Sequence, residues 1–137
     1  MNKILLDTNI ILDACIPERP DHDDAIMLLE HTANDAIYAY ICALSLKDVY
    51  YILCKYDTKH KARDVIEALI EILDIARVDK YTIQEAASSN EPDFEDGIVR
   101  ACAELYSVNF IISRDVKAFK NSNVQALSAK EFIELYL

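Results

Sequence analysis

The sequence predicts one α/β domain, a sandwich built on a mainly parallel sheet, and three observations carry this prediction. Two short segments, Ile4–Leu6 and Phe110–Ile112, are wholly apolar, which is typical of strands buried on both faces of a parallel sheet. Strand-like and helix-like patterns alternate along the chain. The chain has 137 residues with no linker, repeat or low-complexity stretch, so we predict a single domain over residues 1–137.

The first elements are separated by clear stop signals. The strand at 4–6 is followed by a helical turn or short helix over 10–15, which ends at the proline-containing segment 17–20. Apolar residues recur three and four apart over 21–31, which predicts an amphipathic helix. A second strand is predicted over 36–41, with its two tyrosines on the same face.

The rest of the chain continues the alternation. Apolar side chains at helical spacing predict two further long helices, and a stop at residues 89–92 predicts a loop before the next one. The predicted elements are helices over 45–55, 58–73 and 82–88, a strand over 75–78, a helix over 93–106, strands over 109–112 and 124–127, and a final helix over 128–135.

The composition excludes several functions. The chain has one glycine, Gly97, whereas Walker loops and dinucleotide fingerprints need several. No apolar run approaches the roughly 18–20 residues that a membrane-spanning helix requires. The first three residues lead directly into the strand at 4–6, which leaves no room for a signal peptide, so we expect a cytoplasmic protein. The four cysteines form no Cys-x-x-Cys pair and lie among apolar neighbours, which favours reduced thiols over a zinc site.

Acidic residues dominate the charge. The net charge is −10, from 24 acidic and 14 basic residues. This balance opposes non-specific binding of nucleic acids, so a phosphate-bearing substrate would need metal ions or a local basic patch. Asp21, Asp23 and Asp24 open the helix predicted over 21–31, and we interpret them as capping residues that suit the helix dipole, not as metal ligands.

Four aspartates stand where predicted elements begin or end. Asp7 directly follows the first strand, and Asp115 follows the strand that ends at residue 112. The carboxyl ends of parallel strands share one edge of the sheet, where open α/β folds bind their ligands. If these two strands are neighbours, the two carboxylates meet there. Asp96 lies in the first turn of the helix over 93–106, and Asp48 lies near the start of the helix over 45–55.

Each of these acids except Asp7 also has an ordinary structural interpretation. Asp96 could cap its helix and pair with Arg100, four residues further on. Asp115 could pair with the arginine before it or cap the following turn, and Asp48 could form an exposed ion pair with the lysine before it. These alternatives remain open at this stage.

The combination of four acids favours a cation site. Carboxylates that converge without a cation would force some of their number to stay protonated. Mg²⁺ or Mn²⁺, which prefer oxygen ligands, would remove that penalty. A site of this kind performs hydrolytic phosphoryl chemistry by deprotonating a bound water and neutralising the charge of the phosphate.

The sequence resembles the PIN-domain nucleases, a family that includes the toxin ribonucleases of bacterial toxin–antitoxin pairs. Four family motifs occur in register: a strand followed by Asp-Thr-Asn, an acid on a helix after a strand and a small polar turn, an Asp-x-x-Asp helix start, and an acid after an apolar strand and a small hydroxyl. The matching segments, in this order, are Leu6-Asp7-Thr8-Asn9, residues 43–49, residues 93–103 and Ile111-Ile112-Ser113-Arg114-Asp115.

The resemblance implies a three-layer α/β/α sandwich that hydrolyses single-stranded or structured RNA with Mg²⁺ or Mn²⁺. It implies that Asp7, Asp96 and Asp115 are metal ligands and that Asp48 completes the catalytic set by orienting or ligating. It further implies that Asn9 and Ser113 support these acids by hydrogen bonds. The family usually has Glu where Asp48 stands, so the shorter side chain here would bring the helix closer, bind through water or weaken a second metal site.

The resemblance also implies partners: an RNA substrate, an antitoxin protein and a second copy of the chain in a homodimer. Arg114, Lys117 and Lys120 flank the proposed site and are candidate contacts for RNA phosphates. A basic or hydrophobic antitoxin segment could instead occupy the acidic groove. A haloacid-dehalogenase-like phosphatase needs a second Asp where this chain has Asn9, which argues against that class. The remaining alternative is a catalytically weak PIN-like module that binds RNA or protein.

Overall fold

The computed structural model describes residues 1–89 and 93–137, and in these residues five strands form one sheet in which every neighbouring pair is parallel. The order across the sheet is β3-β2-β1-β4-β5, so the first strand of the chain lies in the centre. The strands are β1 (Lys3–Leu6), β2 (Tyr38–Cys42), β3 (Asp74–Ala76), β4 (Phe110–Ile112) and β5 (Gln125–Leu127).

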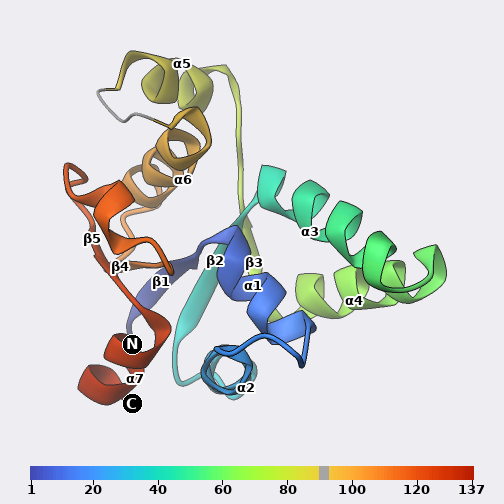
Figure 1. Cartoon of the computed structure of the whole chain (residues 1–137). Coiled ribbons are helices and arrows are strands. Elements are labelled where there is room, and N and C mark those ends of the chain that lie inside the picture. The colour runs from blue at the N-terminus through green and yellow to red at the C-terminus, as the bar shows by residue number, and fades with distance from the viewer. Residues whose placement is uncertain (90–92) are drawn as a thin grey trace.

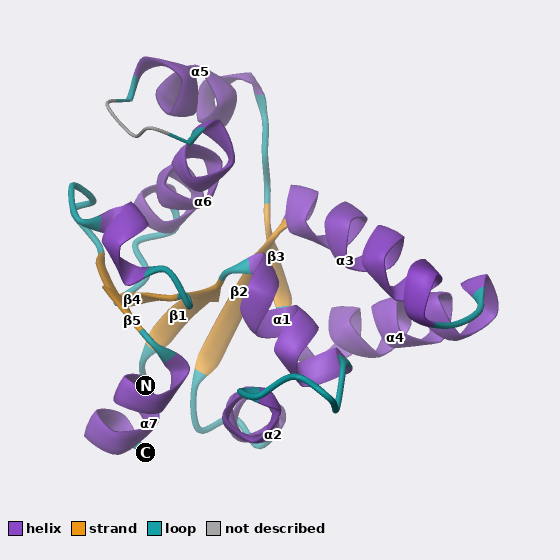
Figure 2. Cartoon of the chain, viewed as in Figure 1, coloured by secondary structure: helices purple, strands orange, loops and turns teal. Residues whose placement is uncertain are grey.

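Helices cover both faces of the sheet (Figure 1, Figure 2). On one face lie α5 (Lys80–Ser88), α6 (Phe94–Leu105) and the short 3₁₀ helix Val116–Phe119. On the other lie α1 (Thr8–Cys15), α2 (His22–Ala33), α3 (Ala43–Tyr56), α4 (Lys59–Ile72) and α7 (Ala129–Tyr136). The prediction of a three-layer α/β/α sandwich is therefore confirmed. No helix in the described part of the chain is long and apolar enough to cross a membrane.

The two helical layers explain why β1 is apolar on both sides. Ile4 and Leu6 belong to the core shared with α1–α4 and α7, whereas Leu5 belongs to the core on the side of α6. All three side chains are at most 1% exposed. Since successive side chains of a strand point to opposite faces, a strand with helices on both faces needs an unbroken apolar run.

The register of the sheet brings the ends of β1 and β4 level, and β2 extends one residue further. Leu6 is paired with Ile41 on β2 and with Ile112 on β4. The pairing extends one residue beyond the strand, because the backbone N–H of Asp7 donates to the carbonyl of Ile112 over 3.0 Å. The residues that follow β1 and β4 therefore emerge at the same edge of the sheet.

The predicted elements are present, with shifted boundaries. The helix expected over 10–15 begins at Thr8, because the Asp7 side chain accepts a hydrogen bond from the Thr8 N–H and caps the helix. The strand expected over 36–41 spans Tyr38–Cys42. The 3₁₀ helix after Asp115 was not predicted as an element. Of the loop predicted over 89–92, residues 90–92 lie outside the described residues. The cysteines are free thiols, as expected.

The interpretation of Asp21 as a capping side chain is wrong. Asp21 occupies the N-cap position of α2, but its carboxylate makes no capping hydrogen bond. Its Oδ2 atom lies 3.6 Å from Nε of Arg114, which belongs to the loop that follows β4. Asp23 and Asp24 lie in the first turn of α2, where acids suit the helix dipole.

Candidate functional site

Asp7 is fixed at the carboxyl end of β1 by hydrogen bonds to both of its carboxylate oxygens. Oδ1 accepts from the backbone N–H of Thr8 over 2.8 Å, and Oδ2 accepts from the hydroxyl of Ser113 over 2.9 Å. Ser113 is 1% exposed and directly follows β4. Burial raises the pKa of Asp7; the hydrogen bonds from Ser113 and Thr8 act in the opposite direction, and the charges of Asp115 and Asp93 add to the rise.

Asp115 is held close to Asp7 through the same serine. The Ser113 hydroxyl oxygen accepts a hydrogen bond of 3.0 Å from the backbone N–H of Asp115. The Asp115 side chain itself is exposed. Its charge contributes to the raised pKa of Asp7 and also to that of Asp96, so the three carboxylates already influence one another electrostatically.

Asp96 reaches the same region from the start of α6. Asp93 caps this helix by accepting a hydrogen bond of 2.8 Å from the backbone N–H of Glu95, which leaves Asp96 half-buried in the first turn. Burial raises the pKa of Asp96 to about 6, and the charges of Asp93, Asp7, Asp115 and Glu95 contribute in that order. A carboxyl group whose pKa is raised by four other acids lies in a strongly negative field.

Asp48 lies in the second turn of α3, the helix that directly follows β2. Its Oδ1 atom accepts a hydrogen bond of 2.9 Å from Nζ of Lys47, so the exposed ion pair that the sequence left open is formed. The same carboxylate raises the pKa of Lys47. Asp48 is 43% exposed.

All four predicted acids line one open cleft of about 800 Å³ at the carboxyl edge of the sheet. Asp7 comes from the end of β1, Asp48 from α3, Asp96 from α6 and Asp115 from the loop after β4. Asn9 and Ser113 line the same cleft. The structure thus brings together residues that lie up to 108 positions apart in the sequence.

Sequence reasoning missed several further residues of this cleft. Asp93 and Glu95 add two acids, and the spacing of Asp93 and Asp96 in one helix start was the available signal. The α3 wall carries a stripe of Lys47, Tyr51 and Lys55, four residues apart, which helical periodicity could have revealed. Nζ of Lys55 lies 4.4 Å from the ring centre of Tyr51. Opposite, α6 presents the half-exposed ring of Phe94.

The family model of the PIN domain matches residues 3–117, which include all four acids of the cleft. The chain belongs to the PIN domain family. It is 26% identical to Ribonuclease VapC1 of Aquifex aeolicus, over 96% of this chain and 94% of that protein.

This PIN domain also shares its fold with solved structures. VapBC2 from Rickettsia felis, bound to a promoter DNA fragment, matches with a TM-score of 0.68 and 16% identity, over 92% of this chain and 98% of that chain. VapC20 from Mycobacterium tuberculosis, described as a toxin that cleaves the sarcin–ricin loop, matches with a TM-score of 0.67 and 16% identity, over 85% of this chain and 95% of that chain. At 16% sequence identity, these similarities establish the fold of the chain and nothing further.

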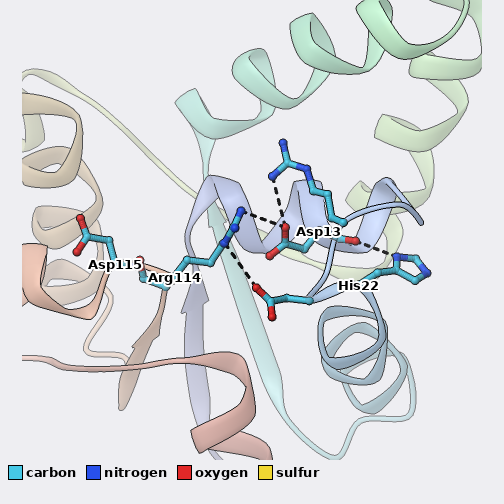
Figure 3. A network of polar contacts seen from close by, with 7 residues as sticks. Asp13, His22, Arg114 and Asp115 are labelled. Carbon is cyan, nitrogen blue, oxygen red and sulfur yellow. Dashed lines mark hydrogen bonds and ion pairs between the residues drawn. The ribbon is translucent and has the colours of Figure 1, made fainter.

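The three basic residues predicted to contact RNA lie outside this lining. In the described part of the PIN domain, the cleft is lined by lysines of α3 and not by Arg114, Lys117 or Lys120. Lys117 and Lys120 are exposed. Arg114 extends away from its neighbour Asp115 toward Asp13 (Figure 3), so the pairing with Asp115 that the sequence left open is not the one formed.

The chemistry of the cleft fits a divalent cation. Hard cations such as Mg²⁺ and Mn²⁺ take carboxylate oxygens, and in this PIN domain the charges of Asp7 and Asp115 raise the pKa of Asp96, while the charge of Asp115 raises that of Asp7. Among the described residues, however, no three His, Cys, Asp or Glu side chains lie close enough to form a finished ligand set. Binding would therefore require the carboxylates to turn toward one another.

Proposed function

We propose that this PIN domain is a divalent-cation-dependent endoribonuclease and the toxin of a toxin–antitoxin pair. The observation that carries the proposal is the meeting of Asp7, Asp48, Asp96 and Asp115 in one cleft, although they come from four separate elements. The similarity to Ribonuclease VapC1 along almost the whole chain supports RNA as the substrate. A cytoplasmic location, where RNA is accessible, belongs to the same proposal.

The proposed roles follow from how each acid is held. Asp7, Asp96 and Asp115 would bind Mg²⁺ or Mn²⁺, which supplies positive charge for the phosphate and acidifies water. Ser113 holds Asp7 and the backbone of Asp115 together, so it supports two of the proposed ligands at once. Asp48 uses Oδ1 for Lys47, which leaves Oδ2 to orient the attacking water. Asn9, in the same cleft, would support these groups by hydrogen bonds.

The walls of the cleft suggest how an acidic protein would hold an acidic substrate. Lys47 and Lys55 are cations placed to meet phosphates, and Tyr51 between them is 62% exposed and offers a ring to a base. Lys117 and Lys120 would contact RNA further along, outside the cleft. Bases can stack on an aromatic ring only when they are unpaired, so this arrangement favours single-stranded RNA.

The antitoxin partner is proposed from the solved structures that share this fold. Neighbours in fold include VapBC2 from Rickettsia felis and FitAB bound to the IR36 DNA fragment, the latter with a TM-score of 0.66 and 20% identity. By analogy, this PIN domain would bind an antitoxin protein and form a homodimer. A segment with basic or apolar side chains would suit the acidic cleft with its exposed rings of Tyr51 and Phe94.

Cleavage of RNA should depend on the divalent cation. We expect the purified chain to cut end-labelled single-stranded RNA in Mn²⁺ and to lose at least about 100-fold in rate when EDTA removes the cation, because the lysines of the cleft can meet a phosphate but cannot acidify the attacking water as a divalent cation does. Excess Mn²⁺ should restore cleavage. Cleavage unaffected by EDTA would contradict the proposal. RNA binding with neither cleavage nor Mn²⁺ binding by calorimetry would favour the catalytically weak binding module, for which the Asp48–Lys47 ion pair is the supporting observation.

Replacing Tyr51 by Ala should weaken RNA binding by about tenfold, since stacking of one base on an aromatic ring contributes about 1–3 kcal/mol. The matched control is Tyr56→Ala. Tyr56 lies on the same helix and is also 62% exposed, but it lines a different pocket. Fluorescence anisotropy of single-stranded RNA, in Ca²⁺ to prevent cutting, measures both variants. Equal affinities for the two variants would remove Tyr51 from the substrate path.

A further inference from the structure

Arg114 pairs with acids that are distant in the sequence, and not with Asp115 beside it. Its neighbour in sequence is Asp115, but its guanidinium is turned toward the α1–α2 side of the sheet (Figure 3). Nη1 lies 3.5 Å from Oδ1 of Asp13, and Nε lies 3.6 Å from Oδ2 of Asp21. The loop that carries Asp115 is thereby attached to α1 and to the start of α2.

The burial of Asp13 makes its ion pair with Arg114 costly to break. Asp13 lies on α1 and is 0% exposed, which is costly for a carboxylate unless cations are close. Arg19 supplies a second guanidinium, with Nη1 3.4 Å from the same Oδ1 atom. In the described part of the chain, Oδ2 of Asp13 is buried without a hydrogen-bond partner. The ring N–H of His22 donates to the backbone carbonyl of Asp13 over 2.8 Å, so it fixes the backbone and adds nothing to the carboxylate.

Asp13 and Asp7 belong to one rigid unit. Asp7 caps α1, and Asp13 lies six residues further along the same helix. The loop after β4 is bound to this unit twice, through the hydrogen bond from Ser113 to Asp7 and through the ion pair from Arg114 to Asp13. Asp115 follows these two attachment points directly, so its position relative to Asp7 is set by both.

We propose that Asp13 and Arg114 are positioning residues that hold the Asp115 carboxylate in register with Asp7 for cation binding, an inference that rests on the proposed function of the cleft. Neither residue touches the substrate or the cation. The ion pair also keeps the Arg114 guanidinium away from Asp115, where it would compete with a cation for the carboxylate.

Two physical effects of removing Arg114 have opposite signs. By charge alone, Arg114→Gln deletes a positive group near an acidic cleft, so a cation should bind more tightly. By positioning, it releases the loop that holds Asp115, so a cation should bind more weakly. Loss of a residue that orients a metal ligand typically costs 10–100-fold in metal affinity. The direction of the change therefore decides between the two effects.

Calorimetry of the full chain with Mn²⁺ measures that direction. We expect Arg114→Gln to weaken Mn²⁺ binding about tenfold and Arg114→Lys to recover part of the loss. The matched control is Arg19→Gln, which removes the other guanidinium from Asp13 but lies outside the Asp115 loop. It should stay within about twofold of the wild type. Asp115→Asn serves as the reference for loss of a ligand.

A second measurement needs no cation. Hydrogen exchange of the Asp115 backbone N–H, which donates to Ser113, should be faster in Arg114→Gln than in Arg19→Gln. Mn²⁺ affinity that is unchanged or higher in Arg114→Gln would overturn the inference, as would an equal loss in Arg19→Gln. If Arg114→Gln does not fold, an Arg114→Lys variant whose Asp115 N–H exchanges no faster than in Arg19→Gln, although its Mn²⁺ affinity is lower, would also overturn it. If Asp115→Asn binds Mn²⁺ like the wild type, the proposed ligand set is wrong. The positioning role is tested separately, because equal exchange rates of the Asp115 N–H in Arg114→Gln and Arg19→Gln would refute it.

Discussion

Asp7→Asn is expected to reduce RNA cleavage by about 100- to 1,000-fold while the protein stays folded. Asn has the same shape as Asp, so its carbonyl oxygen can still accept from the Thr8 N–H, and its amide can donate to the Ser113 hydroxyl. It cannot provide the negative charge that a divalent cation needs. Because burial raises the pKa of Asp7, the neutral variant should unfold at a temperature equal to or above that of the cation-free wild type.

The control for this prediction is Asp23→Asn. Asp23 also lies in the first turn of a helix, but on α2 and outside the cleft lining. This variant should cleave like the wild type, whereas Asp96→Asn should lose activity as Asp7→Asn does. In cells, expression of the wild type should arrest growth and Asp7→Asn should relieve the arrest. Wild-type rates in both Asp7→Asn and Asp96→Asn would show that the measured cleavage arises elsewhere.

The raised pKa values predict opposite effects of pH on cation binding and on cation-free stability. The pKa of Asp96 is raised to about 6 and that of Asp7 is also raised, so protons compete with Mn²⁺ below pH 6. Affinity for Mn²⁺ should rise most steeply below pH 6, by up to about tenfold per unit for each proton displaced, and should level off toward pH 7. Calorimetry at pH 5, 6 and 7 measures this slope, and Asp96→Asn should make it shallower.

Cation-free stability should change in the other direction. The folded chain holds the Asp96 proton up to about pH 6, whereas an unfolded chain loses it near the ordinary value of 3.8. Between these values the folded state binds more protons, so raising the pH from 4 to 6 should destabilise it. The expected loss is on the order of 1 kcal/mol, because solvent screens a half-buried group. Thermal unfolding in EDTA across this range tests the sign, and a transition temperature that rises with pH would contradict it.

Local patterns were sufficient for the fold and for the placement of Asp7 and Asp115, whereas Asp48 and Asp96 were grouped with them by the resemblance to the PIN-domain nucleases. An unbroken apolar run identified β1 and β4, and parallel strands end at a common edge, which placed Asp7 and Asp115 together. The structure adds that Asp48 both pairs with Lys47 and lines the cleft, so the two interpretations of this acid are compatible.

The sequence was not sufficient for the pairing of charges. Asp13 follows three apolar residues on a short helix, and no local pattern tells a buried acid from an exposed one there. Arg114 has an acid as its neighbour, yet it pairs with one 101 positions away. Asp21 has the position of a cap but bonds to that same arginine. Such choices depend on which surfaces the folded layers bring into contact, which periodicity does not record.

The central place of β1 in the sheet has a consequence for the order in which the cleft forms during synthesis. The ribosome makes β1 before its neighbour β4, and the serine that binds Asp7 follows more than 100 residues later. A nascent chain that ends before residue 113 has neither Asp115 nor the bond that immobilises Asp7. The four-acid cleft can therefore be completed only after residue 115 has been made, late in the translation of the domain.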